Sequence, residues 1–358
     1  MKGEEALAYI AAKRPAIAAA LASLEAERGG ELAWVPGEGA EGISRIAEFC
    51  LRGKMIRGCL VILGAEAAGD AVDGERLPRL AAAMELFQAG LLAHDDIMDR
   101  DSTRRGAPTV HARYAAESLA AGSMDYAHVG EALGICLGDL CYFEAFGILA
   151  RALEGEACAA KISALCAGIL SEVAVAQMAD VRWGASDREI GEAEILAMYR
   201  SKTARYTFSL PLAAGALAAG AKALVGPLVS LGEELGILFQ LRDDELGLFG
   251  DEAATGKPRG SDLREGKKTL FRSRLLAAAS ASESRALAAL FGGARTPSEA
   301  ELAYIERLAR ELGVADSIRE LSEAAQSRAR AILGGLGLPP RALAVLDSLV
   351  DYVTARDR

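Results

Sequence analysis

Apolar residues that recur at helical spacing are the feature of this sequence that most limits its fold. Most of them are Ala and Leu, which favour helices, whereas runs of β-branched residues are scarce and aromatic residues make up only 5% of the chain. Ile305, Leu308 and Leu312, for example, fall on one face of a helix. The sequence therefore predicts an all-α fold.

The breaks between these helical segments are short. They contain Gly and Pro, as in Arg104–Pro108 and Gly334–Pro340, and none has the length or composition of a flexible linker. We therefore expect residues 1–358 to form a single large domain of ten or more helices. Some of these helices must be central, rich in Ala and buried on all sides.

Charge and hydropathy restrict the function and the location of the protein. The formal net charge of −10 disfavours a general nucleic-acid-binding protein. The longest uncharged stretch, residues 206–221, contains Pro211 and much Ala and Gly, so we interpret it as a buried helix and expect no membrane span. The N-terminal residues are acidic where a signal peptide is basic, and the six cysteines include no CxxC pair. We therefore expect a cytoplasmic protein.

An acidic motif of the form DDxxD follows one apolar helical run. In a helix, Asp95 and Asp99 would share a face one turn apart, with Asp96 beside them. Repulsion between the carboxylates and the negative end of the helix both oppose this arrangement. A hard divalent cation removes both costs, and oxygen ligands without His or Cys favour magnesium over zinc.

A second acidic pair repeats this plan. Asp243 and Asp244 end another apolar run, and a loop rich in basic residues follows; Arg104 and Arg105 likewise follow the first motif. Acidic helix ends beside basic residues suit the binding of a diphosphate through bridging magnesium ions and basic side chains. Two solvated acidic helix ends are the alternative interpretation.

At these residues the sequence resembles the trans-isoprenyl diphosphate synthases, which form the polyprenyl synthetase family. The resemblance extends from about Lys54 to Thr269. Besides the two acidic motifs, the matching blocks are GKxxR at Gly53–Arg57, RRGxPxxH at Arg104–His111, KT at Lys202–Thr203 and FQxxDD at Phe239–Asp244. The resemblance implies a helical bundle around a central cavity, and a homodimer.

The resemblance also implies the residues that bind substrates and metal. The residues implied for isopentenyl diphosphate are Lys54, Arg57, Gln88 and Arg105. Those implied for the allylic diphosphate and the other substrate contacts are Arg104, Lys202, Thr203, Gln240, Lys257 and Lys267. The implied magnesium ligands are Asp95, Asp96, Asp99, Asp243 and Asp244. The implied catalytic set consists of these aspartates with Arg104, Lys202 and Lys257.

In the implied mechanism, three magnesium ions bind the allylic diphosphate, held by Asp95 and Asp99 on one side and by Asp243 on the other. The C–O bond of the allylic diphosphate ionises, and the double bond of isopentenyl diphosphate attacks the resulting cation. The sequence departs from the family pattern at Gly247, where many members have Asp. This departure affects the third metal position most.

The helix before Asp95 is expected to line the pocket for the growing chain. Leu91 and Phe87 lie four and eight residues upstream on the face of Asp95, and Gly90 lies one residue off it. In the family, a bulky aromatic residue four or five positions upstream stops growth at C15. The sequence therefore predicts an open near floor, meaning that no bulky side chain at positions 90 and 91 closes the pocket. Phe87, one turn deeper, is then the residue predicted to limit chain growth. The predicted product is geranylgeranyl diphosphate (C20), made from dimethylallyl, geranyl or farnesyl diphosphate.

Several alternatives remain. The product could be farnesyl diphosphate (C15) or a longer chain, and Phe87 could pack into an ordinary core. A class I terpene cyclase would need a second metal motif that includes Asn, but the chain contains no Asn. A non-catalytic subunit of a two-component prenyl synthase tends to lose the aspartates, whereas here both motifs retain them.

Overall fold

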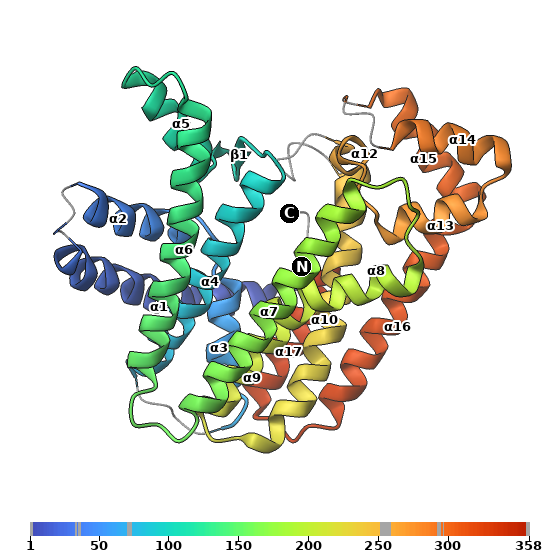
Figure 1. The fold of residues 1–358 in the computed structure, drawn as a ribbon. Helices are drawn as coiled ribbons and strands as arrows, with labels where there is room; N and C mark the ends of the chain where they lie inside the picture. Colours follow the sequence, from blue (N-terminus) through green and yellow to red (C-terminus); the bar gives the residue numbers. More distant parts are fainter. Residues whose placement is uncertain are drawn as a thin grey trace. The chain divides into compact units, whose positions relative to one another are not determined.

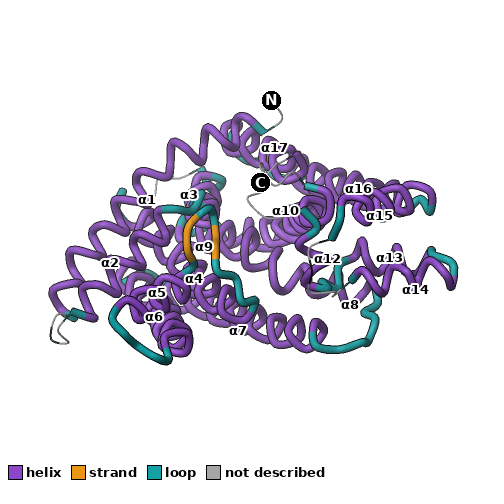
Figure 2. Tube along the Cα trace, turned by 90° about the horizontal axis from the view of Figure 1, so that it is seen from above, coloured by secondary structure: helices purple, strands orange, loops and turns teal. Residues whose placement is uncertain are grey.

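The computed structural model describes residues 3–32, 34, 37–69, 74–250, 259–291, 295 and 297–355. Across these ranges the chain is helical except for turns, loops and a two-stranded hairpin, the orange segment in Figure 2. The predicted all-α class is therefore confirmed. The prediction of one domain over 1–358 stays a prediction, as does that of a central cavity.

The chain folds into two compact units. The N-terminal unit comprises 8–164 and 211–222, and the C-terminal unit comprises 1–7, 165–210 and 223–358. Elements mainly in the N-terminal unit are α1 (Glu4–Glu31), α2 (Glu38–Leu51), α3 (Ile56–Glu66), α4 (Arg76–Met98), β1 (Thr103–Arg104), β2 (Ala107–Pro108), α5 (Val110–Ala120), α6 (Tyr126–Ala152) and α9 (Leu210–Ala218) (Figure 1).

The C-terminal unit contains the remaining elements. They are α7 (Ala159–Gly184), α8 (Glu192–Met198), the π-helix η1 (Tyr199–Ser209), α10 (Lys222–Phe249), α12 (Ser261–Glu265), α13 (Leu270–Ala278), α14 (Ala281–Leu290), α15 (Glu299–Glu311), α16 (Val314–Gly334) and α17 (Pro340–Ala355).

In the N-terminal unit, α4 is a largely buried helix that contains several Ala residues, of the kind that the sequence predicts without locating it. Its residues Leu80–Leu86 are almost entirely buried, and α4 packs against α3 and α6. Helix α9 approaches α3 so closely that a Cβ on Gly64 would lie 2.8 Å from the carbonyl carbon of Leu212. Only glycine allows two helix backbones to come this near.

In the C-terminal unit, η1 and α10 contribute to one apolar cluster. This cluster joins Ile190, Ile195, Tyr199, Ile237, Leu241 and Leu270. A second cluster lies among α13, α14, α15 and the end of α10. The C-terminal end of α10, which carries the second acidic motif, is thus anchored by buried side chains.

Four helices in the described part of the chain are long and apolar enough to cross a membrane, judged by length and composition alone. They are α1, α6, α7 and α10. Between 22% and 44% of the most apolar 18-residue segment of each helix is buried inside the structure. The predicted absence of a membrane span stays a prediction.

Candidate active site

The first acidic motif lies at the C-terminal end of α4, as predicted. The N–H group of Asp99 donates to the carbonyl oxygen of Asp95 at 2.8 Å, so the helical turn continues through the motif. Asp96 points inward and is fully buried, whereas Asp99 is exposed and Asp95 half-exposed. Asp95 and Asp99 are therefore the two carboxylates that a ligand can reach.

The hairpin after α4 brings Arg104 back onto the motif. Nε of Arg104 donates to Oδ1 of Asp96 at 2.5 Å, and its Nη2 lies 3.8 Å from Oδ2 of Asp95. Burial raises the pKa of Asp96 to about 6, although the charge of Arg104 opposes the shift. Oδ2 of Asp96 is buried and has no hydrogen-bond partner among the described residues. An orphaned carboxylate oxygen beside two accessible carboxylates fits a bound cation.

Three residues other than glycine in the described ranges have positive φ; two lie in predicted binding segments, and the third directly follows the first acidic motif. Met55 (φ 55°) is in the GKxxR block, and Arg100 (57°) and Arg105 (55°) are in the loop after the first motif. The left-handed region costs such residues free energy. Residues of this kind cluster at functional sites, where the surrounding structure holds them in place.

Glu85 on α4, a buried acid that no sequence motif indicates, holds the GKxxR block. Its Oε1 accepts from the N–H group of Gly58 at 2.7 Å. Met55 supplies no side-chain cap to α3, so Glu85 satisfies an N-terminal donor of that helix. Burial raises the pKa of Glu85, and this hydrogen bond and the charges of Arg57 and Arg105 oppose the shift. The only sequence signal for Glu85 was an acid inside an apolar helical run.

The other predicted isopentenyl-diphosphate residues surround this block. Lys54 is exposed, and Arg57 and Gln88 are half-buried. Nη1 of Arg105 lies 3.0 Å from the position of a Cβ on Gly53, so Arg105 packs over the same turn. The N-terminal unit therefore gathers basic side chains from segments about 50 residues apart in sequence, near Glu85.

At the second acidic motif, the two aspartates have different surroundings. Asp243 is exposed, whereas Asp244 is buried. Asp244 accepts from the hydroxyl of Tyr199 through Oδ2 and from Nε2 of Gln240, 2.9 Å away, through Oδ1. Burial raises its pKa to about 8. Because both oxygens of Asp244 accept hydrogen bonds, Asp243 is the carboxylate of this pair that a ligand can reach; metal binding by Asp244 stays a prediction.

These hydrogen bonds extend from Asp244 into neighbouring elements. Oγ1 of Thr203 donates to Oε1 of Gln240 at 2.9 Å. The hydroxyl of Tyr199 accepts from the N–H group of Leu270, also at 2.9 Å. Tyr199, which no sequence motif indicates, thus connects η1, α10 and the start of α13.

The KT motif lies within the π-helix η1. Lys202 donates to Oδ2 of Asp180 on α7 at 2.6 Å. π-Helical turns in proteins occur frequently at functional sites, because the extra residue per turn redirects neighbouring side chains. Lys202 and Thr203 leave η1 toward different partners, an acid on α7 and an amide on α10.

Lys257 and Lys267 are the two predicted substrate-binding lysines after the second acidic motif, and only Lys267 lies in the described ranges. Nζ of Lys267 lies 3.3 Å from Oδ1 of Asp262 and 3.3 Å from Oε2 of Glu265. Lys257 lies outside the described residues, as does Asp251 beyond the second motif.

The predicted chain-length residues on α4 pack against α6. Phe87 is fully buried, and its ring meets that of Phe146 edge to face, with centroids 4.9 Å apart. A Cβ on Gly90 would lie 2.9 Å from the carbonyl oxygen of Gly138 and 2.9 Å from Cε1 of Tyr142. Gly90 thus packs against α6, and the prediction of an open near floor stays a prediction. Leu91 remains half-exposed.

Among the described residues, no three Asp, Glu, His or Cys side chains are gathered into a preformed metal cage. Magnesium binds in such cases through one or two carboxylates, with water and substrate phosphates as its other ligands. The accessible carboxylates Asp95, Asp99 and Asp243 fit this mode of binding.

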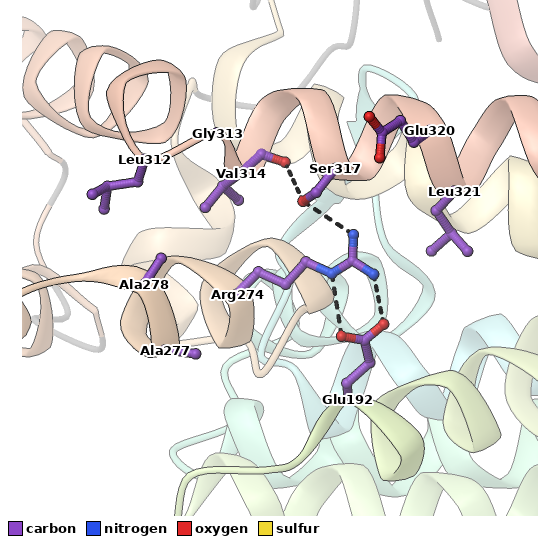
Figure 3. A pocket seen from close by; sticks show the side chains of 10 residues that line it. All are labelled: Glu192, Arg274, Ala277, Ala278, Leu312, Gly313, Val314, Ser317, Glu320 and Leu321. Carbon is purple, nitrogen blue, oxygen red and sulfur yellow. Dashed lines mark hydrogen bonds and ion pairs between the residues drawn. The ribbon is translucent and has the colours of Figure 1, made fainter.

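A pocket of about 690 Å³ lies elsewhere in the C-terminal unit, and none of the predicted site residues lines it. In Figure 3, Arg274 pairs with Glu192 through two hydrogen bonds and donates to Ser317, and the rest of the lining includes Glu320 and apolar side chains such as Leu312 and Leu321. The guanidinium group of Arg274 is therefore already hydrogen-bonded to other side chains of the protein.

Comparisons with known proteins agree with the motifs. Residues 41–308 match the profile of the polyprenyl synthetase family. The chain is 38% identical to a geranylgeranyl diphosphate synthase of Sulfolobus acidocaldarius over 62% of this chain and 63% of that one, just under two thirds of its length. It is 33% identical to a (2E,6E)-farnesyl diphosphate synthase of Mycobacterium tuberculosis over 85% of this chain and 80% of that one.

The fold is likewise similar to solved structures. A geranylgeranyl pyrophosphate synthase from Corynebacterium glutamicum, complexed with isoprenyl diphosphate and magnesium, has a TM-score of 0.87 and 31% identity, and the match covers 97% of this chain and 98% of that one. With the family profile spanning most of the sequence, these likenesses confirm the resemblance first seen in the motifs: the chain belongs to the polyprenyl synthetase family.

Proposed function

We propose that this protein is a magnesium-dependent prenyltransferase of isoprenoid biosynthesis, which condenses isopentenyl diphosphate head to tail with an allylic diphosphate. The observation that carries this proposal is the end of α4, where accessible Asp95 and Asp99 adjoin a buried carboxylate oxygen without a partner and the guanidinium of Arg104. Carboxylates that can bind a metal cation therefore lie beside a guanidinium group that can bind a diphosphate. Family membership supports the same reaction class.

Each set of residues has a distinct role in the proposed mechanism. Asp95, Asp99 and Asp243 would hold magnesium, three ions in all, and the bound metal supplies neutralisation of charge on the diphosphate leaving group. Arg104 and Lys202, both held by acids in the structure, donate to the allylic diphosphate.

The second substrate has its own residues in this proposal. Lys54, Arg57 and Arg105 bind isopentenyl diphosphate, and Glu85 keeps the GKxxR turn in place. Helix α4 supplies an apolar wall that excludes water from the allylic cation, because water would capture it.

The experiment that tests the proposed function is a product assay. Purified protein is incubated with magnesium, labelled isopentenyl diphosphate and, separately, dimethylallyl, geranyl or farnesyl diphosphate, and the products are sized. We expect condensation that chelation of the metal abolishes, with geranylgeranyl diphosphate as the end product. Cyclised hydrocarbon would indicate a terpene cyclase, and no condensation with any starter would contradict the proposal.

The proposed C20 product rests on Phe87 as the floor of the tail pocket. Replacing Phe87 with Ala would remove a ring that now lies against Phe146, and we expect the main product to lengthen by at least one isoprene unit. The measurement is chromatography of the dephosphorylated products. Leu86→Ala is the matched control, because Leu86 is equally buried on the same helix and points elsewhere. Identical product lengths for wild type and Phe87→Ala would exclude Phe87 as the floor.

We also propose that the protein is a cytoplasmic homodimer that binds no nucleic acid and does not span a membrane. Helix α6 supports a dimer, because Ile135, Phe143 and Phe146 are exposed on adjoining parts of its surface, with Phe143 exposed to 70%. Light scattering of the wild type and of Phe143→Ser tests this, and a wild-type mass of one chain would contradict it.

A further inference from the structure

Two polar residues of the π-helix η1 are hydrogen-bonded to two polar residues of α10. The hydroxyl of Tyr199 donates to Oδ2 of Asp244, and Oγ1 of Thr203 donates to Oε1 of Gln240 at 2.9 Å. Nε2 of Gln240 also donates to Oδ1 of Asp244 at 2.9 Å. On each helix the two residues are about one turn apart, so a shift of η1 along α10 would break both hydrogen bonds between the helices.

The backbones of the two helices are also close to each other beside these hydrogen bonds. A Cβ on Gly236 would lie 3.0 Å from the backbone nitrogen of Ala204. Gly236, Gln240 and Asp244 are spaced four residues apart, so they share one face of α10. That face therefore contacts η1 over about two helical turns.

The hydroxyl of Tyr199 also contacts a third element, α13. It accepts from the N–H group of Leu270 at 2.9 Å, in the first turn of that helix. The side-chain oxygen of the N-cap residue Thr269 accepts from a different donor, the N–H group of Arg272. Leu270 is fully buried and Tyr199 is only 6% exposed, so loss of the hydroxyl would leave the N–H group of Leu270 buried without this partner.

The three elements that meet at this hydroxyl carry residues assigned to the allylic diphosphate and its metal. Lys202 lies three residues after Tyr199 on η1. Asp243 precedes Asp244 on α10, and Lys267 lies just before the start of α13. The position of each of these residues therefore depends on how η1, α10 and α13 are held together.

We propose that Tyr199 is a positioning residue for the allylic diphosphate. Its hydroxyl fixes η1, which carries Lys202, against the second acidic motif and the first turn of α13. The inference rests on the proposed function, because that function assigns Lys202 to the allylic diphosphate. Only a side chain with a hydroxyl at its far end can donate to Asp244 and accept from Leu270 at the same time while its ring packs in the apolar cluster.

The test is steady-state kinetics of the full-length Tyr199→Phe variant, with geranyl diphosphate and isopentenyl diphosphate varied in turn. A Phe ring can keep the place of Tyr199 in the apolar cluster, so the change removes the hydroxyl alone. We expect KM for geranyl diphosphate to rise about tenfold or more, the scale seen when a residue that supports a ligand is lost. KM for isopentenyl diphosphate should stay within about twofold of wild type, because its assigned residues lie in the N-terminal unit.

Tyr304→Phe is the matched control. It removes a hydroxyl from α15 of the same unit, where Tyr304 packs against the second apolar cluster, and both KM values should equal those of wild type. Urea unfolding of the two variants accompanies the kinetics, because a merely structural role would lower stability without separating the two KM values.

Three results for Tyr199→Phe would overturn the inference: an unchanged KM for geranyl diphosphate, an equal rise of both KM values, or failure to fold. In each case an active wild type leaves the proposed function standing. A wild type that forms no product would instead contradict the proposed function, and the inference with it.

Discussion

Replacing Asp95 with Ala is expected to lower kcat for condensation by about a thousandfold, with the protein still folded. Asp95 is one of two accessible carboxylates at the end of α4, and Asp96 beside it is already engaged by Arg104. Its loss would leave Asp99 as the only accessible acid of the first motif. Charge stabilisation at the leaving group counts mainly in the transition state, so kcat should fall more than the affinity for substrate. Steady-state kinetics at saturating magnesium measures the change.

The control for this variant is Asp139→Ala. Asp139 is a half-exposed acid on α6 whose Oδ1 lies 3.5 Å from Nε2 of His94, one residue before the motif. Its removal changes the charge near α4 by the same amount without touching the motif, and kcat should stay close to that of wild type. A similar decrease of kcat in both variants would show that the overall electrostatic field of the protein, and not the first motif, causes the effect. Full activity of Asp95→Ala would contradict the assignment of the first motif.

Replacing Gly236 with Ala is expected to lower the free energy of unfolding by about 2–3 kcal/mol and to impair catalysis as well. A Cβ on Gly236 would lie 3.0 Å from the backbone nitrogen of Ala204 and closer still to its Cα. Ala204 follows Thr203 in η1, and a backbone cannot yield as a flexible side chain does. The π-helix must therefore shift away from α10, which strains the Thr203–Gln240 hydrogen bond. Denaturant unfolding and kcat/KM measure the two effects.

Gly168→Ala provides the comparison for Gly236→Ala. Gly168 is an exposed residue within α7 of the same unit, and nothing lies within 4 Å of its Cβ position. Ala there should raise the stability by up to about 1 kcal/mol, because Gly is the poorer helix former. Equal stability of the two variants would show that η1 and α10 are not in rigid contact.

The sequence sufficed for those parts of the site that depend on neighbouring residues. The helical turn through Asp95 and Asp99 could be predicted because apolar periodicity and spacing fix it. The all-α class could be predicted because the abundance of Ala and Leu and the helical spacing of apolar residues are also properties of neighbouring residues. The sequence also predicted that some helices are Ala-rich and buried, without indicating that α4 is one of them.

The parts that could not be predicted depend on contacts between distant segments. The sequence does not indicate what Gly90 meets; in the structure a helix some 50 residues later passes over it at Gly138 and Tyr142. Likewise, nothing in the sequence around Gly247 indicates that Cγ of Asp262 lies 2.5 Å from the position of a Cβ on this glycine. Spacing along one helix says which residues share a face, and only tertiary packing says what that face meets.

The order of segments in the N-terminal unit has a consequence for protein synthesis. Residues 211–222 complete this unit, although 165–210 belong to the other one. Helix α3 meets α9 where Gly64 lies against Leu212, so that surface stays uncovered until the ribosome has made some 45 residues of the other unit. Domains generally fold as units while the chain emerges. A nascent chain that stalls before residue 211 would therefore expose an apolar helix face to chaperones, and a fragment ending at 164 would be an unsuitable substitute for the unit.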